Sequence, residues 1–383
     1  MRIAILTDTY YPIYDGVVRF VEYLARALRD NGHTPVIIAP KVPKRFYLGD
    51  EKHEPGIEQI RVPVLPVTVK DYFLTLPSYR LFSAIRSCDM IIVNSLSLTI
   101  IYALGFNKIL KKPVYQFIHH DEYELAKLVF GYPDTIVNIF MKFFMHMTMS
   151  MQRFAIATDK FYEKTLRFGA KPEQIFRVPF VYEKEDVTRE QIEEFRKIYN
   201  IPDGNKILLY LGRLANEKNV LTIFEVFKHF SQMKDVTCIM VGRGYHLIPL
   251  RQRVEEEGLN IILTGRLHDR YLPVVYTIAD MLVTPTFHET LCFTVVEALN
   301  YHTIPVVNGK YHEPSLSEDN TIFIKNIKDK NEIIEKVSQV LFDDEKLRKM
   351  QKNTEEAAKY HSYDVFAKIW AEEVAKVENQ LKK

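Results

Sequence analysis

The strongest constraint on the fold is an alternation of two patterns along the 383-residue chain. Short runs that are apolar at nearly every position alternate with longer segments in which apolar residues recur at helical spacing. A continuously apolar run indicates a strand covered on both faces, as in parallel sheets whose strands are connected by helices. The sequence therefore predicts an α/β fold with parallel sheets.

This alternation occurs twice, in two series separated by the polar segment Glu183–Asp203. The strands predicted in the first series are Arg2–Thr7, Thr34–Ala39, Ile60–Pro66, Met90–Val93, Val114–Ile118 and Arg153–Thr158. Those predicted in the second series are Lys206–Leu211, Val236–Val241, Asn260–Thr264, Met281–Thr284 and Ile304–Val307. We expect two Rossmann-like domains facing each other across a cleft, residues 1–183 and 184–362. The amphipathic helix predicted at 363–383 is expected to cross back to the first domain.

Composition excludes several classes of protein. Lys and Arg number 51 against 49 Asp and Glu, a net charge of +2 that is too balanced for a general nucleic-acid binder. The three cysteines, Cys88, Cys238 and Cys292, are far apart, which excludes a disulfide scaffold and fits a reducing compartment. No segment has the pattern of a signal peptide or a membrane span, so we expect a cytoplasmic protein.

Candidate site residues follow predicted strands, where ligands of parallel α/β sheets bind. Directly after Lys206–Leu211 come Gly212, Arg213 and, five residues later, Lys218. The planar guanidinium of Arg213 and the point charge of Lys218 suit a diphosphate. The alternative is a solvated basic pair beside Glu217.

A second segment runs from His288 to Glu297 after the strand Met281–Thr284. A helix is expected over Leu291–Leu299, which places Glu289 in the loop and Glu297 two turns into the helix. Glu297 can accept hydrogen bonds from a vicinal diol such as ribose. The backbone N–H groups of this helix start can bind sugar hydroxyls or phosphate, and they belong to Thr290, Leu291, Cys292 and Phe293.

Two further segments are weaker signals. Gly16, after the first strand, allows a close backbone approach to phosphate, although a plain turn glycine explains it better when this segment is taken alone. No G-x-G-x-x-G occurs, since Gly242-Arg243-Gly244 lacks the third glycine, which counts against a dinucleotide reductase. His119, His120 and Asp121 follow Val114–Ile118 and could orient a sugar or take a proton. They have no partner set for a metal site.

Together these segments resemble glycosyltransferase family 4, the retaining nucleotide-sugar enzymes of the GT-B fold. The resemblance covers nearly the whole chain, through "DGVVRFVEYLARALRDNGHTPVIIAP", "LGRLANEKNV", "LTGRL", "YTIAD" and "TPTFHETLCFTVVEAL". In the N-terminal half, "GIEQIRVPVLPVT" and "HHDEYELAKLVFGYP" are similar to the branch that glycosylates diacylglycerol or phosphatidylinositol lipids.

The resemblance implies roles for the candidate residues. Arg213 and Lys218 would hold the donor diphosphate, Glu289 and His119 would lie close to the transferred sugar, and Glu297 would bind the ribose. The remaining donor-binding positions implied are Gly16, Gly212, His288, Thr290, Leu291, Cys292 and Phe293. His120 and Asp121 would lie on the acceptor side. The family also implies a UDP- or GDP-sugar donor, retention of configuration, and neither a bound metal nor another cofactor.

The sequence departs from the family pattern at three places. Leu291-Cys292 stands where Phe-Gly is usual after the first glutamate, Thr303 replaces a glycine, and Pro179–Glu183 replaces P-x-G-V-D. The cysteine puts the identity of the donor sugar in question. These changes keep open a non-catalytic nucleotide-sugar-binding subunit, and an epimerase of the same fold is a third alternative.

The acceptor is also left open by the residues. The stretch Tyr123–Phe154 is rich in Phe and Met, which fits a helix lying on a membrane surface as well as an ordinary core helix. The lipid-branch resemblance favours a membrane glycerolipid or a lipid-linked sugar, with peripheral contact at the inner face of the cell membrane. A soluble saccharide or polysaccharide acceptor is the alternative.

Overall fold

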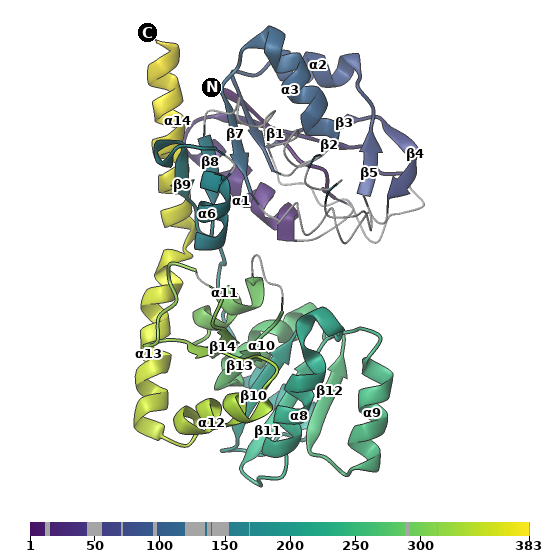
Figure 1. Ribbon diagram of the computed structural model, residues 1–383, viewed down its shortest axis with the longest axis vertical. Coiled ribbons are helices and arrows are strands. Elements are labelled where there is room, and N and C mark those ends of the chain that lie inside the picture. Colours follow the sequence, from purple (N-terminus) through teal and green to yellow (C-terminus); the bar gives the residue numbers. More distant parts are fainter. Residues whose placement is uncertain are drawn as a thin grey trace. The chain divides into compact units, whose positions relative to one another are not determined.

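The computed structural model of the protein describes residues 1–11, 16–43, 56–69, 72–94, 98–118, 135, 139, 153–167, 169–287, 292–311 and 313–382. The chain divides into two compact units (Figure 1). Met1–Val181 and Tyr363–Lys383 form one, called the N-terminal unit below, and Tyr182–Ser362 form the other, called the C-terminal unit.

The N-terminal unit contains a parallel sheet of seven strands in the order β3-β2-β1-β6-β7-β8-β9. These strands are β1 (Arg2–Leu6), β2 (Thr34–Pro40), β3 (Glu58–Val62), β6 (Met90–Val93), β7 (Val114–Phe117), β8 (Arg153–Ile156) and β9 (Ile175–Arg177). The helices that the structure describes in this unit are α1 (Gly16–Asp30), α2 (Tyr79–Arg86), α3 (Leu98–Leu110), α6 (Asp159–Arg167) and α14 (Tyr363–Leu381). In the middle, Ile5 of β1 lies opposite Ile37 of β2 and Ile92 of β6. All three side chains are fully buried, as expected for strands covered on both faces.

One predicted strand was wrong. Instead of a single strand over Ile60–Pro66, β3 ends at Val62 and a second strand, β4 (Val64–Val69), pairs antiparallel with β5 (Tyr72–Thr75) in a separate two-stranded sheet. Pro63 lies between β3 and β4 and has no N–H to donate to a neighbouring strand, so the parallel ladder stops there.

The C-terminal unit contains a parallel sheet of six strands in the order β12-β11-β10-β13-β14-β15. These strands are β10 (Lys206–Leu211), β11 (Val236–Val241), β12 (Ile261–Gly265), β13 (Met281–Thr284), β14 (Ile304–Asn308) and β15 (Ile322–Ile324). Its helices are α7 (Arg189–Ile198), α8 (Val220–Phe230), α9 (Leu247–Glu256), α10 (Leu272–Ile278), α11 (Phe293–Asn300), α12 (Lys330–Leu341) and α13 (Asp344–Tyr360). The predicted parallel α/β fold is therefore confirmed in both units.

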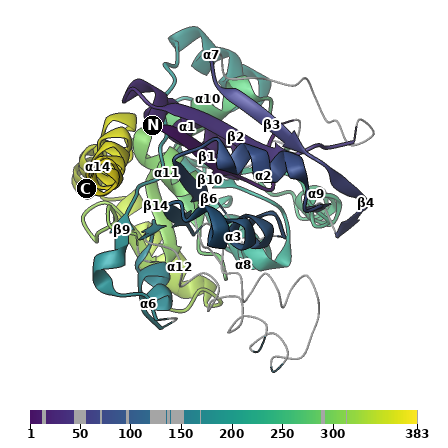
Figure 2. The same cartoon turned by 90° about the horizontal axis from the view of Figure 1, so that it is seen from above.

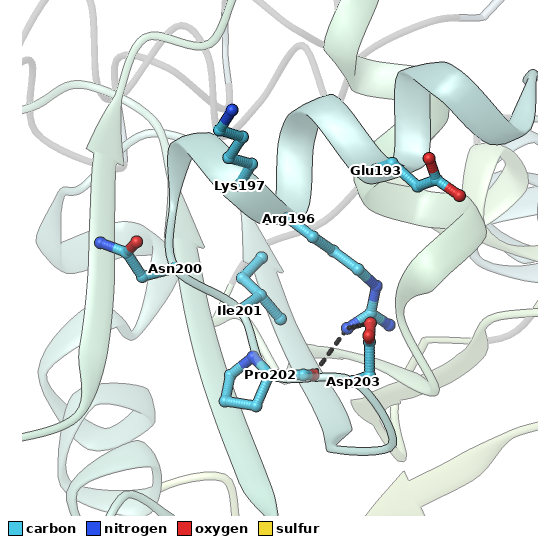
Figure 3. Close-up of a pocket in the computed structure, with 7 residues that line it drawn as sticks. All are labelled: Glu193, Arg196, Lys197, Asn200, Ile201, Pro202 and Asp203. Carbon is cyan, nitrogen blue, oxygen red and sulfur yellow. Dashed lines mark hydrogen bonds and ion pairs between the residues drawn. The ribbon is translucent and has the colours of Figure 1, made fainter.

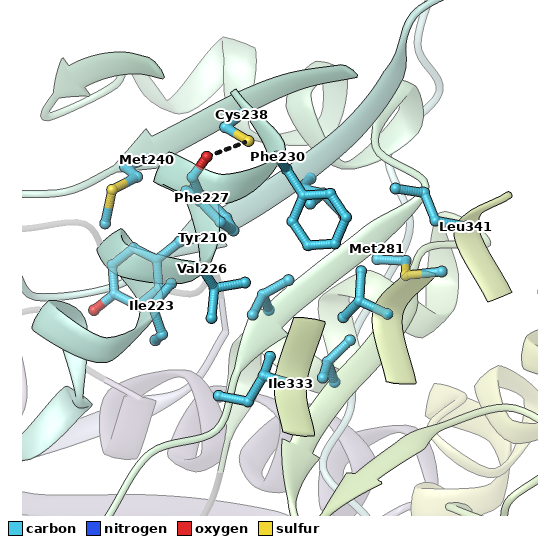
Figure 4. Packing of buried hydrophobic residues seen from close by; sticks show 14 of the residues in the cluster. Tyr210, Ile223, Val226, Phe227, Phe230, Cys238, Met240, Met281, Ile333 and Leu341 are labelled. Atoms are coloured by element: carbon cyan, nitrogen blue, oxygen red, sulfur yellow. Dashed lines mark hydrogen bonds between the residues drawn. The ribbon is translucent and has the colours of Figure 1, made fainter. Parts of the chain in front are cut away.

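Alternate residues of β10 enter two different cores of the C-terminal unit. Leu208 and Tyr210 belong to one core, to which α8 and α12 contribute, and Figure 4 shows Tyr210 in it together with Phe227 and Ile333. Ile207 and Leu209 belong to the other core, to which α7, α10 and α11 contribute. This two-residue alternation places one layer of helices on each face of the sheet.

The C-terminal helix α14 packs on α1 within the N-terminal unit (Figure 2). The hydroxyl of Tyr363 donates to Asp30 Oδ2 at 2.6 Å, and the Arg26 guanidinium lies 4.0 Å from the centre of the Tyr363 ring. Further along the helix, Glu373 is buried and accepts from Arg153 Nη2 of β8 at 2.9 Å. The buried Trp370 lies edge-on to Phe176 of β9. Helix α14 is thus held to the sheet by both apolar packing and a buried ion pair.

Replacing Glu373 by Gln should destabilise the N-terminal unit by about 2–4 kcal/mol, since it leaves the Arg153 charge without its anion in a largely desolvated place. Trp370 is the chain's single tryptophan, so its fluorescence during urea unfolding reports this unit. The neighbouring Glu372 is exposed, and E372Q should change stability by less than about 0.5 kcal/mol. Equal stabilities for the two variants would show that the buried pair contributes nothing.

Candidate functional site

The strand order of each sheet defines one place where ligands bind in folds of this kind. This place is at the strand where the chain, having added strands on one side, crosses over and adds the next strand on the other side. In the C-terminal unit this strand is β10, between β11 and β13, and in the N-terminal unit it is β1, between β2 and β6. Ligands of open parallel sheets bind beyond the carboxyl ends of these strands. Gly212 follows β10 directly, and Gly16 is the first residue of the helix after β1.

The segment 212–219 is held by the strands beneath it. The hydroxyl of the buried Tyr210 donates to the carbonyl oxygen of Arg213 at 2.6 Å. The backbone N–H of Leu214 donates to the carbonyl oxygen of Arg243, which follows β11, at 2.8 Å. Asn219 ends the segment in the left-handed region, with φ of 55°, and starts α8. These contacts fix the backbone from which Arg213 and Lys218 extend.

Two glycines after β11 allow this arrangement, a structural role that was not predicted from the sequence. A Cβ on Gly242 would lie 1.8 Å from the carbonyl oxygen of Gly212, and one on Gly244 would lie 2.2 Å from that of Leu214. Both distances are much shorter than a van der Waals contact. The two loops therefore pack backbone against backbone, with no room for a side chain at either glycine. In the sequence, the sign of this close packing is the short G-R-G run directly after a predicted strand.

In this structure the Arg213 side chain pairs with Glu217. The distance from Nη2 to Oε1 is 2.9 Å, and the two side chains are 73% and 39% exposed. For Arg213, this matches the alternative to a phosphate contact, in which the basic side chains are solvated beside Glu217. An exposed ion pair of this spacing contributes only about 0.3–0.5 kcal/mol. A diphosphate can therefore replace Glu217 as the partner of Arg213 at little cost.

The structure brings the segment after β10 next to the segment after β13. The backbone N–H of Phe287 donates to the carbonyl oxygen of Glu217 at 3.3 Å, and Asn219 Nδ2 donates to the carbonyl oxygen of Pro285 at 3.0 Å. Lys218 lies between these two anchored residues and is partly exposed. The basic segment and the start of the predicted glutamate segment are thus neighbours at one sheet edge.

Helix α11 begins later than predicted. Its first residue is Phe293 rather than Leu291, because Cys292 has non-helical φ and ψ of −97° and 85° and its N–H donates to the hydroxyl of Tyr311 at 3.3 Å. Glu297 consequently lies just over one turn into the helix, not two. Its Oε2 accepts a hydrogen bond from the hydroxyl of Tyr276 at 2.7 Å.

The departure at Thr303 has a structural explanation. Thr303 is fully buried, and its hydroxyl donates to the carbonyl oxygen of Tyr276 at 2.7 Å, at the end of α10. The carbonyl oxygen of Ala279 lies 3.2 Å from the same hydroxyl. The threonine hydroxyl therefore shares its one proton between two carbonyl groups at the end of the helix, a contact that a glycine could not make.

Seven of the candidate residues lie outside the described residues, so their roles remain predictions. They are His119, His120, Asp121, His288, Glu289, Thr290 and Leu291. Elsewhere, within the described part of the chain, no three His, Cys, Asp or Glu side chains gather in a way that could hold a metal ion.

A surface hollow lies near the amino end of β10, at the other end of this strand from Arg213 (Figure 3). It is lined by residues from the end of α7 and from the turn that leads into β10, including Arg196, Asn200 and Asp203. The Arg196 guanidinium already donates to the carbonyl oxygen of Pro202 at 2.7 Å. This hollow therefore lies away from the carboxyl ends of the strands, where the ligands of parallel sheets bind.

Two family models match consecutive parts of the chain. "Glycosyltransferase Family 4" matches residues 14–179, and "Glycosyl transferases group 1" matches residues 191–357. The chain belongs to glycosyltransferase family 4. It is a hexosyltransferase, and its two parallel α/β units have the GT-B fold.

Individual relatives agree with this assignment. The chain is 25% identical over 336 residues to an alpha-monoglucosyldiacylglycerol synthase of Streptococcus pneumoniae, covering 83% of this chain and 74% of the relative. It is 27% identical over 307 residues to a GDP-mannose-dependent alpha-mannosyltransferase of Mycobacterium tuberculosis, covering 78% and 76%. The crystal structure of Anabaena Alr3699/HepE in complex with UDP-glucose has a TM-score of 0.72 at 14% identity, covering 98% of this chain and all of that one. Among the helices of the glycosyltransferase that the structure describes, none has the length and apolarity needed to cross a bilayer.

Proposed function

We propose that this glycosyltransferase transfers a hexose from a UDP- or GDP-sugar to a hydroxyl group of a membrane glycerolipid or lipid-linked sugar, with retention of configuration. The observation that carries the donor part is the position of Arg213 and Lys218. Both extend from a backbone that is fixed beyond the carboxyl end of β10, where the strand order of the C-terminal sheet reverses.

The chemistry follows from the charge that develops on the leaving group. The bond between the sugar C1 and the diphosphate oxygen breaks, which leaves positive charge on the sugar and negative charge on the diphosphate. Cations already fixed beside the departing oxygens stabilise this charge better than water does. Arg213 exchanges Glu217 for the diphosphate, and Lys218 adds a second positive charge.

Retention requires the acceptor oxygen to form its bond to C1 on the face from which the diphosphate leaves. The acceptor proton then passes to the diphosphate, so the protein needs no separate strong base. In this proposal Glu289 and His119 stabilise the sugar, Glu297 binds the ribose, and Gly16 allows backbone contact with the phosphates. The helix start at Phe293 adds an N–H donor.

A lipid acceptor is supported by the similarity to alpha-monoglucosyldiacylglycerol synthases of Streptococcus pneumoniae and of Acholeplasma laidlawii. The second of these is 25% identical over 391 residues, covering 96% of this chain and 95% of the relative. Other relatives are GDP-mannose-dependent alpha-mannosyltransferases, so the base and the sugar of the donor must be determined by experiment. The Phe- and Met-rich stretch that suggested membrane contact lies almost entirely outside the described residues.

Replacing Arg213 by Ala should lower kcat/KM for the nucleotide sugar by about 10²–10³, because one fixed cation at the leaving group is lost. The donor is first found as the nucleotide sugar that raises the melting temperature in a screen of UDP- and GDP-sugars. Release of nucleoside diphosphate is then measured with each variant.

The matched control is R189A. Arg189 pairs with Glu193 at the same spacing and at 2.8 Å, but on α7, away from the strand ends. This control should keep wild-type activity. Equal rates for R213A and R189A would refute the proposed leaving-group contact.

The acceptor is tested by transfer of labelled sugar to diacylglycerol in vesicles containing anionic lipid. We expect label in the organic phase and sedimentation of the protein with the vesicles at low salt. R213A should still sediment but transfer little. If the protein does not bind vesicles at low salt and transfers sugar to a soluble saccharide, the acceptor is the soluble saccharide and not a lipid.

A further inference from the structure

A buried tyrosine contacts the carboxylate that the proposed function assigns to the ribose. Tyr276 lies on α10 with 1% of its surface exposed, and its hydroxyl donates to Glu297 Oε2 at 2.7 Å. A buried tyrosine hydroxyl needs a hydrogen-bond partner, and an ionised carboxylate is a strong one. The contact joins two helices whose residues are 21 positions apart in the sequence.

The hydroxyl of Tyr276 acts as the donor at any physiological pH. Its pKa lies well above the ordinary value for tyrosine, first because the group is buried and then because the charge of Glu297 is close. The proton therefore stays on the phenol oxygen, which donates a hydrogen bond to Glu297.

Tyr276 has little freedom to move. Its ring is stacked on that of Tyr301, with the ring centres 5.9 Å apart and the planes inclined by 5°. The backbone of Tyr276 is held by the hydroxyl of Thr303, and the Tyr301 hydroxyl accepts from the N–H of Glu185 at 3.0 Å. The hydroxyl of Tyr276 is thus presented to Glu297 from a fixed position.

Glu297 benefits from such a fixed partner. It is a long, partly exposed side chain on the second turn of α11, and a free glutamate would have to lose rotamer freedom on binding a ligand. A carboxylate has about four lone-pair sites, so Oε2 can accept from Tyr276 and still accept from a hydroxyl group of a ligand. Holding the carboxylate in one orientation before binding removes part of the ordering cost.

We propose that Tyr276 is a positioning residue that orients the Glu297 carboxylate for the two hydroxyl groups of the nucleotide ribose. This inference rests on the proposed ribose-binding role of Glu297. It adds Tyr276 to the ribose site, although the apolar residues around Tyr276 in the sequence predict only a core residue.

The test uses Y276F, which keeps the ring and its stacking and removes only the hydroxyl. Calorimetric titration with UDP and GDP first establishes which nucleotide binds the wild type. The Kd of that nucleotide should rise about fivefold to tenfold in Y276F, as expected for losing a hydrogen bond that orients a charged group. The Kd of its 2′,3′-dideoxy analogue should not change, because that ligand offers Glu297 no ribose hydroxyls.

Two further variants separate positioning from general disruption. Y271F removes a similar bond, from the Tyr271 hydroxyl to Glu194 Oε1 at 2.8 Å, just before α10, and should leave both Kd values unchanged. In the E297Q background, adding Y276F should produce little further loss, since the two residues act through one contact. An equal effect of Y276F on both nucleotides, or no effect on either, would overturn the inference.

Failure of the proposed function gives a different result. A wild type that binds UDP or GDP and loses affinity in R213A supports the donor site, whatever Y276F does. A wild type that binds neither nucleotide overturns both the donor site and the inference that rests on it.

Discussion

A steric constraint at the carboxyl edge of the C-terminal sheet fixes the backbone on which the candidate site is built. Gly242 and Gly244 pack against the carbonyl groups of Gly212 and Leu214 at distances that exclude any Cβ atom. Since the loops after β10 and β11 are locked together in this way, Arg213 extends from a rigid support rather than from a mobile loop. Because this backbone is held, only the Arg213 side chain has to move, from Glu217 to the diphosphate, when the donor binds.

The regular part of the fold could be predicted from the sequence because strands covered on both faces are apolar at nearly every position. Met90–Val93 and Lys206–Leu211 were predicted with the bounds that the structure has. The three-residue strands β9 and β15 were missed, because a run that short shows no periodicity. The division at Pro63 was missed because the apolar residues continue past it, although the missing N–H of proline ends the ladder.

The candidate site was only partly predictable. Arg213 and Lys218 could be proposed from the sequence because a basic pair directly after a strand is a local pattern. The contacts that organise the site are not local. Tyr276 contacts Glu297 from another helix, 21 positions away in the sequence. A tyrosine among apolar residues does not indicate such a polar partner. The pairing of Arg213 with Glu217 in place of a phosphate depends on the ligand, which a sequence pattern does not include.

Hydrogen–deuterium exchange with and without the nucleoside diphosphate that binds tests the central claim most directly. Peptides covering residues 211–219 and 292–300 of the wild-type protein should exchange more slowly when the nucleotide is bound. Peptides covering 193–203, around the surface hollow near the amino end of β10, should not change. Protection confined to 193–203, or its absence from 211–219, would contradict a donor site at the end of β10.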